Sequence, residues 1–232
     1  MKKAFTILCA AMFSLASLPS FAQFKLGVTV GVSSNSFGYN YEDSDDEDEE
    51  RDATKSKIGY KVGLAAEYSF VEALSLQTGV LLSNKGAKYE LEDSGESLKG
   101  KNSLNYMEIP LNLAFKFSNF QVHAGPYVGF GLSGKTEYES TFIGNRKGNI
   151  KFKNKVSESD LDDLEENEDY FRRTDVGLNV GAGYRFGSVL VTATYSKGLS
   201  SLYPTYEGED DDEDDKMTNK GISLTATWFF NK

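Results

Sequence analysis

Eight segments of the chain alternate apolar and polar residues with a period of two, and this pattern limits the possible folds more than any other feature of the sequence. In one of them Ile58, Tyr60, Val62 and Leu64 are separated by glycine or lysine. The eight segments span residues 24–33, 58–70, 74–85, 107–117, 120–132, 175–186, 189–196 and 221–230. Alternation over such lengths predicts strands with one apolar and one polar face. Most of the segments have about the ~9–11 residues that a tilted transmembrane strand needs.

The connections between these segments alternate in length. Three are very short, at residues 71–73, 118–119 and 187–188. The other four are long, at residues 34–56, 86–103, 134–173 and 199–220. In an antiparallel meander, this rhythm places the short turns at one end and the long loops at the other, which is typical of outer-membrane barrels.

The alternation leaves open which face points outward, because a soluble barrel of the lipocalin type would bury its apolar face. Two features favour a membrane barrel. The polar face is rich in Gly, Ser, Thr and Asn, which suit the narrow lumen of eight strands. Aromatic residues of the apolar face cluster near the short turns, as in an interfacial girdle. They are Phe24, Tyr68, Phe70, Phe115, Phe117, Phe120, Tyr184, Phe186, Trp228 and Phe230. We therefore predict an all-β fold: an eight-stranded antiparallel up-and-down transmembrane β-barrel with long acidic extracellular loops.

The first residues have the composition of a secretory signal peptide. Lys2 and Lys3 precede a mostly apolar stretch, 4–18, and Ser20-Phe21-Ala22 resembles a cleavage site. We expect residues 1–22 to be removed and residues 23–232 to form one outer-membrane β-barrel domain. The expected location is the outer membrane of a Gram-negative cell, reached through the periplasm.

Three of the predicted strands resemble those of a known family. Tyr106-Met107-Glu108-Ile109-Pro110-Leu111 resembles the "Y-x-E-I-P-L" strand of the PorT-like outer-membrane β-barrel (porin) family of Bacteroidetes. The stretches 124–130 and 175–183 are similar to two further strands of that family. The resemblance implies an eight-stranded barrel in the outer membrane, and it suggests a link to type IX protein secretion.

Charged residues on the polar face of the strands would lie inside the barrel, where each charge needs a partner. We predict a network of ion pairs that fills the lumen, with Glu108 near its centre. Its members are Lys61, Glu67, Lys85, Glu108, Lys116, Asp175 and Arg185. Counted from the short turns, Glu67, Lys116 and Arg185 lie near the periplasmic end, and the other four lie higher in the lumen. Eight strands leave no open channel in any case.

Acidic runs occur in three of the long connections. Nine acids lie in 42–52, eight in 158–169 and eight in 207–215. Such runs are usually solvated, and 159–164 has the pattern of a capped short helix. Weak Ca²⁺ or Mg²⁺ binding is the alternative, and it could bridge the loops to lipopolysaccharide phosphates. The candidate ligands are Asp45, Asp46, Asp48, Asp211, Asp212 and Asp214.

The sequence favours a structural or interaction protein over an enzyme. His123 is the single histidine, and its predicted place near a short turn is the wrong end for a substrate in the outer leaflet. Gly129-x-Gly131-x-x-Gly134 spells a dinucleotide motif but no helix follows it, so no cofactor is expected. The net charge of −10 argues against nucleic acid. Expected partners are outer-membrane lipid, lipopolysaccharide, the barrel-assembly machinery and a cationic or envelope protein. A small porin or ligand-binding barrel is the other alternative, and a lipid-active enzyme is disfavoured.

Overall fold

The computed structural model describes residues 23–40, 54–93, 96–140, 144–162, 164, 168–208 and 216–230. Nearly all of these residues belong to strands, and α3 (Glu158–Asp162) is the one helix among them. The strands are β1 (Phe24–Asn40), β2 (Thr54–Val71), β3 (Leu74–Lys85), β4 (Ala87–Asp93), β5 (Glu96–Phe117), β6 (Phe120–Ser140), β7 (Gly144–Phe152), β8 (Lys155–Val156), β9 (Glu168–Phe171), β10 (Thr174–Phe186), β11 (Val189–Gly198), β12 (Thr205–Tyr206) and β13 (Lys216–Phe229). No helix in these ranges is long and apolar enough to cross a membrane.

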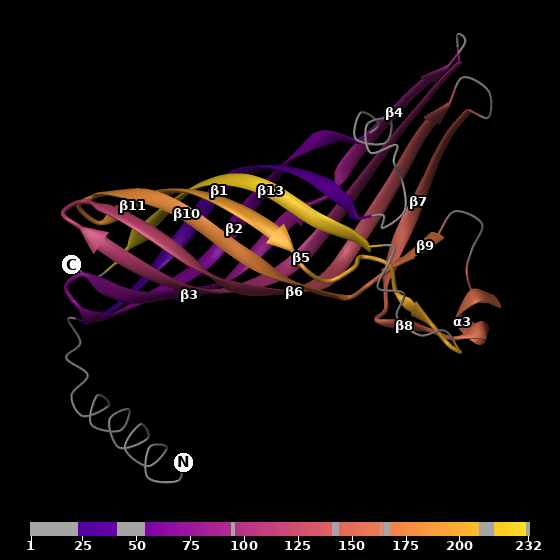
Figure 1. The fold of residues 1–232 in the computed structure, drawn as a ribbon. Helices are drawn as coiled ribbons and strands as arrows, with labels where there is room; N and C mark the ends of the chain where they lie inside the picture. The colour runs from indigo at the N-terminus through magenta and orange to yellow at the C-terminus, as the bar shows by residue number, and fades with distance from the viewer. Residues whose placement is uncertain are drawn as a thin grey trace.

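Eight strands pair one after another in a cyclic order. The order is β1, β2, β3, β5, β6, β10, β11 and β13, after which β13 pairs with β1, and every pairing is antiparallel. These strands wrap around a common axis (Figure 1). The turns at 72–73, 118–119 and 187–188 lie where short turns were predicted, so the all-β fold is confirmed.

The described part of the chain has more strands than the eight that were predicted. Thirteen strands are present in the described part of the chain, and five of them, β4, β7, β8, β9 and β12, lie in connections that we expected to be loops. β5 begins at Glu96, eleven residues before the predicted start at Met107, and β6 continues to Ser140. Strand pairing therefore extends well past the barrel, and β4 to β7 form a projection that leans away from the barrel axis (Figure 1).

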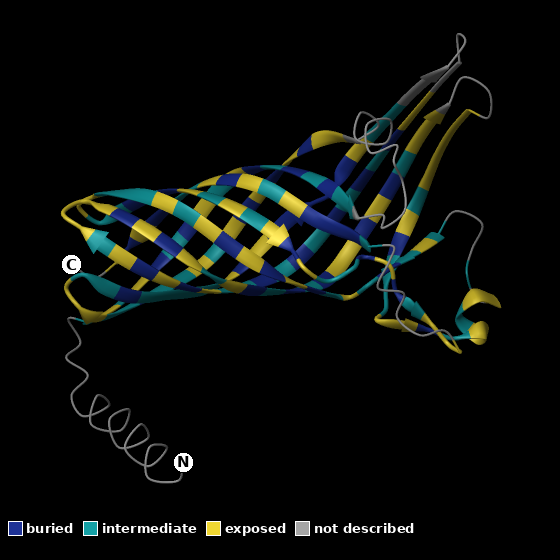
Figure 2. Cartoon of the chain, viewed as in Figure 1, coloured by how far each residue is buried: buried dark blue, intermediate teal, exposed yellow. Residues whose placement is uncertain are grey.

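Within the cyclic part, polar side chains are buried and apolar side chains are exposed. Glu67, Glu108 and Asp175 have at most 1% of their surface exposed, whereas Leu64 is 62% exposed and Trp228 is 56% exposed. Figure 2 shows this as a checkerboard of buried and exposed positions along each strand. The soluble alternative with an apolar interior is therefore wrong for this region, because here the polar face is the inner one.

Exposed aromatic rings surround the end with the short turns and touch one another. The ring centroids of Phe117 and Phe120 are 5.8 Å apart, those of Phe120 and Tyr184 are 4.7 Å apart, and those of Tyr184 and Phe186 are 4.5 Å apart. Trp228 and Phe230 form a further edge-on pair at 5.4 Å. A belt of this kind is typical of the lipid–water boundary of a transmembrane barrel.

The opposite end carries a buried apolar group that we call the apolar cap. Its members come from six strands and one connection: Phe37, Ala87, Leu104, Tyr106, Ile150, Phe171, Leu202 and Met217. Tyr39, Tyr89 and Phe152 pack against it. On β5 the inner face changes from polar Asn112 and Glu108 to apolar Leu104, and the pairing with β6 shifts register between Asn105 and Tyr106. The cap therefore covers the loop-side end of the lumen.

Two connections that are distant in sequence are held together beside this cap. β7 and β9 pair in parallel, with Phe152 opposite Phe171, and β8 and β12 pair in parallel, with Val156 opposite Tyr206. The backbone N–H of Arg172 donates to the carbonyl of Leu202 at 2.7 Å. These contacts hold together the predicted loops 134–173 and 199–220.

Candidate functional site in the barrel lumen

Four charged side chains meet inside the barrel beneath the apolar cap, and we call them the upper charge cluster: Lys61, Lys85, Glu108 and Asp175. The ammonium group of Lys61 lies 2.7 Å from Glu108 Oε1, and that of Lys85 lies 2.8 Å from Glu108 Oε2. Lys85 also lies 2.9 Å from Asp175 Oδ2. The four residues come from β2, β3, β5 and β10, and each occupies an inward position of the period-two pattern. The period-two alternation therefore places all four charged side chains inside the barrel, where they form ion pairs with one another.

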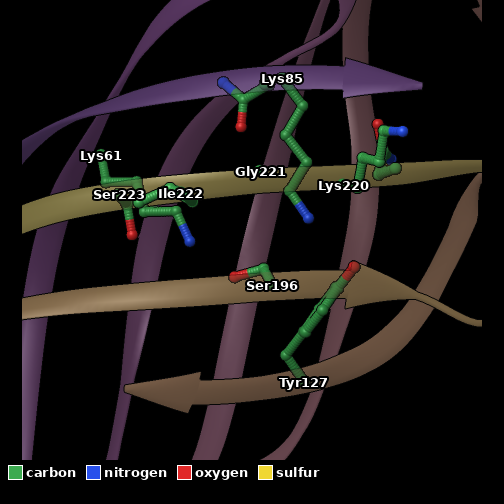
Figure 3. A pocket seen from close by; sticks show the side chains of 10 residues that line it. Lys61, Lys85, Tyr127, Ser196, Lys220, Gly221, Ile222 and Ser223 are labelled. Carbon is green, nitrogen blue, oxygen red and sulfur yellow. The ribbon is translucent and has the colours of Figure 1, made fainter. Parts of the chain in front are cut away.

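Neutral groups complete the upper charge cluster. Asn219 Nδ2 donates to Asp175 Oδ2 at 2.9 Å, and the hydroxyl of Tyr127 donates to the same carboxylate at 3.4 Å. The Lys85 ammonium lies 4.2 Å from the centroid of the Tyr127 ring, within range of a cation–π interaction. Figure 3 shows Lys85 and Tyr127 reaching toward one small space from different strands. Its volume of about 10 Å³ is close to the room that one water molecule needs.

A second group, the lower charge cluster, lies toward the short turns. Glu67 is its centre: Oε1 accepts from Lys116 at 2.8 Å, and Oε2 accepts from Arg185 at 2.7 Å and from Gln77 at 2.8 Å. The guanidinium carbon of Arg185 also lies 4.9 Å from the ring centroid of Phe229. One carboxylate is therefore satisfied by three donors, two of them charged.

Neutral polar side chains fill the lumen between the two clusters. His123 Nε2 lies 3.1 Å from the hydroxyl of Thr194, and paired threonine hydroxyls occur at Thr29–Thr227 and Thr192–Thr225. A cavity of about 90 Å³ lies among these groups. The lumen is therefore a packed polar interior with space for a few water molecules.

Two glycines of β10 make room for the large side chains of the lumen. A Cβ at Gly177 would lie 2.6 Å from the Tyr127 ring, and a Cβ at Gly181 would lie 2.6 Å from the His123 ring. Gly131 of β6 does the same for the cap, because its Cβ would lie 2.2 Å from Phe152. The glycine spacing that spells a dinucleotide motif thus lies within a strand beside packed side chains.

The structure brings the seven predicted lumen residues together in two groups. Lys61, Lys85, Glu108 and Asp175 form one cluster, and Glu67, Lys116 and Arg185 form another. Uncharged groups occupy the lumen between the two clusters. The sequence also missed Tyr127, Asn219 and Gln77, whose inward positions were the available signal.

The predicted cation ligands lie outside the described residues. They are Asp45, Asp46, Asp48, Asp211, Asp212 and Asp214. The described residues contain no group of three or more His, Cys, Asp or Glu that could hold a metal ion. In the second acidic run, 158–169, Asp160 pairs with Lys153, and Glu168 lies 2.5 Å from Lys151. These two acids are thus bound to lysines of the same loop.

The short helix predicted within 159–164 occurs as α3 at Glu158–Asp162. The N–H of Asp160 donates to the carbonyl of Ser157, and the N–H of Ser157 donates to the Asp160 carboxylate, both at 3.0 Å. Hydrogen bonds from Lys153 and from Ser157 lower the pKa of Asp160 to about 2. The carboxylate therefore helps to fix the first turn of the helix.

Comparison with known proteins agrees with the cyclic pairing and the inverted burial. The model of the outer membrane protein beta-barrel domain matches residues 20–203. The chain belongs to this family. Membership makes it an outer-membrane β-barrel protein. The match does not reach the PorT-like assignment, the Bacteroidetes source or the link to type IX secretion, which stay predictions.

Solved outer-membrane proteins resemble this family member only distantly. Ail of Yersinia pestis is 13% identical with a TM-score of 0.43, over 90% of this chain and 99% of Ail. Neisserial surface protein A is 10% identical with a TM-score of 0.40, over 88% of this chain and 96% of its own. The Escherichia coli outer membrane protease OmpT is 9% identical with a TM-score of 0.36, over 93% of this chain and 100% of its own. No curated protein matches the chain.

Proposed function

We propose that this protein is a closed, non-conducting eight-stranded barrel of the Gram-negative outer membrane, which works as a structural or interaction protein through its loop side. The eight strands of the cyclic order would span the membrane, with the aromatic belt at the periplasmic boundary. The projection and the apolar cap would then stand outside the cell.

The packing of the lumen is the observation that carries this proposal. The two charge clusters block the inner space at two depths, and the apolar cap covers its loop-side end. The larger cavity has a volume of about 90 Å³, which is room for a few water molecules. A continuous aqueous path would require both clusters and the cap to move.

The same cavity argues against a ligand-binding barrel. Sites for small molecules usually have volumes of ~300–1,000 Å³, several times the space in this lumen. The geometry also gives no support to an enzyme, since His123 contacts the hydroxyl of Thr194 inside the barrel and lies away from the loop-side surface.

Interactions would therefore involve the exterior and the acidic runs. Residues 42–52 and 207–215 supply a high density of carboxylates, which would attract Ca²⁺, Mg²⁺ or a cationic envelope partner by charge alone. Such attraction is screened by salt, so we expect weak, salt-sensitive binding there.

Planar-bilayer recording tests the proposed function. The purified protein should insert and show heat-modifiable migration on a gel, yet it should give no stable conductance steps. A variant that lacks both carboxylates of the upper charge cluster, Glu108→Ala with Asp175→Ala, serves to show how conductance would respond to a loosened lumen. Stable conductance steps of the unmodified protein would contradict the proposal.

A further inference from the structure

A row of lysines crosses the outward face of the projection. Lys55 pairs with Lys88, Lys88 pairs with Lys101, Lys101 pairs with Glu137, and Glu137 pairs with Lys147. Direct cross-strand partners lie on the same face of a sheet. Four lysines and one glutamate, which we call the lysine row, therefore stand side by side across β2, β4, β5, β6 and β7.

Neighbouring positions of that face add further charge. Two residues beyond the row, toward the tip of the projection, Lys99 pairs with Glu139 on one side and with Glu90 on the other. Lys135 lies two residues before Glu137 on β6, toward the barrel. Together with the lysine row, this gives six lysines and three glutamates. The side chains of Lys55 and Lys147 are 60% and 79% exposed. The surface is thus cationic and open in a chain whose long connections are otherwise acidic.

The lysine row stands directly beyond the lipid-facing surface. On β5 the outward positions run from Leu111, Ile109 and Met107 through Asn105 and Ser103 to Lys101. Lys101 lies six positions before Met107, which is about 20 Å along a strand at ~3.4 Å per residue. For a strand tilted by about 40°, the height is about 15 Å. Because the projection leans outward and lysine side chains are long and flexible, the ammonium groups can reach down to the headgroup layer.

We propose that the lysine row binds the phosphate groups of lipopolysaccharide in the outer leaflet. The proposal rests on the proposed orientation in the outer membrane. Phosphates just above the hydrocarbon layer match the charge and the height of the row. At the end of the row Lys55 pairs with Glu90. At its centre Glu137 competes weakly for the lysines, because it lies 3.5 Å from Lys147 and 3.6 Å from Lys101. Ammonium groups at such distances keep hydrogen-bonding capacity for a phosphate.

Binding of phosphate groups to the lysine row is tested with vesicles of phosphatidylcholine that contain diphosphoryl lipid A. The protein is inserted, released in mild detergent, and the lipid A molecules that stay bound are counted by native mass spectrometry. The test variant carries Lys→Gln at Lys55, Lys88, Lys101 and Lys147. The control variant loses the same number of charges at Lys151, Lys153, Lys155 and Lys216, which lie outside the row.

We expect the wild type and the control to retain lipid A, and the test variant to bind it at least about tenfold more weakly, since four positive charges near the anionic surface are lost. Dephosphorylated lipid A should be lost from all three. Equal retention by the test variant would overturn the proposal, as would retention that does not depend on phosphate. Heat-modifiable migration of each variant is checked first: a wild type that fails to insert would refute the proposed function, whereas an inserted protein that ignores phosphate would refute only this inference.

Discussion

The same strands build two regions with opposite patterns. Between the short turns and the upper charge cluster, β5 directs Asn112 and Glu108 inward and Leu111 and Leu113 outward. Past that cluster, the same strand directs Leu104 inward and Lys101 outward. The hydrogen-bonded ladder continues through both regions with one bulge, next to Asn105. The environment therefore decides which face is apolar: lipid requires an apolar exterior, and water requires an apolar interior.

Breaking the polar interior should have the largest effect. Glu108→Ala removes the partner of Lys61 and of Lys85, and loss of one member of a buried ion pair costs about 3–5 kcal/mol. We expect the urea midpoint of the vesicle-inserted protein to fall accordingly. Glu139→Ala, at an exposed site outside the lumen, is the control and should change stability by about 0.5 kcal/mol or less. Equal midpoints for the two variants would mean that the upper charge cluster does not stabilise the barrel.

Breaking the apolar interior should have the next largest effect, and it should be local. Leu104→Ala opens a cavity in the apolar cap, at a cost of about 3 kcal/mol. Hydrogen exchange should become faster in β7 and β9, while β10 and β11 stay protected. The matched control is Leu111→Ala on the outward face of the same strand, which is half exposed and leaves no cavity. Uniform loss of protection across all strands would show that the two regions unfold as one unit.

A glycine substitution probes how tightly the lumen is packed. A Cβ at Gly181 would lie 2.4 Å from the carbonyl oxygen of Ala193 and 2.6 Å from His123. We expect Gly181→Ala to cost about 1–3 kcal/mol through strain, read from the same urea titration. In Gly38→Ala the nearest atom would be 3.3 Å away, on a side chain, so this control should cost less. If the two variants have the same stability, the lumen has more room than the packing implies.

The smallest effect is expected on the loop side, from protonation of the Asp160 carboxylate at low pH. The pKa of its carboxyl is lowered to about 2 from an ordinary value of 3.8, chiefly by the hydrogen bond from Lys153. A lowered pKa in the folded state means that the stabilisation is complete above about pH 4 and is lost as the pH falls through 2. Amide exchange at Ser157 should become faster over that interval. Asp160→Asn should show no such step, and a step that persists in this variant would exclude Asp160 as its cause.

The barrel part of the fold could be predicted from the sequence because its rule is local. Alternation placed Glu67, Glu108 and Asp175 on the face opposite to that of Leu64, and the small polar residues and the aromatic girdle identified the first face as the interior. The three short turns followed from the spacing of the segments. These features depend only on neighbouring residues and on the period of a strand.

The loop side could not be predicted in the same way. On the loop side the apolar residues of the strands point inward. The pattern of outward-facing apolar residues therefore ends near Met107, although β5 itself begins at Glu96. β7 pairs in parallel with β9, and β8 pairs in parallel with β12. No local sequence pattern shows which segments pair in this way.

Site-directed spin labelling tests the inverted pattern most directly. Single cysteines are introduced in a Cys9→Ser background at Leu111 and Lys101, two outward positions of β5, and the vesicle-inserted protein is probed with oxygen and with a water-soluble nickel complex. The account predicts that a label at position 111 is accessible to oxygen and shielded from nickel, and that a label at position 101 shows the reverse. Nickel access at position 111 equal to that at position 101 would contradict the assignment of the lower region to the membrane.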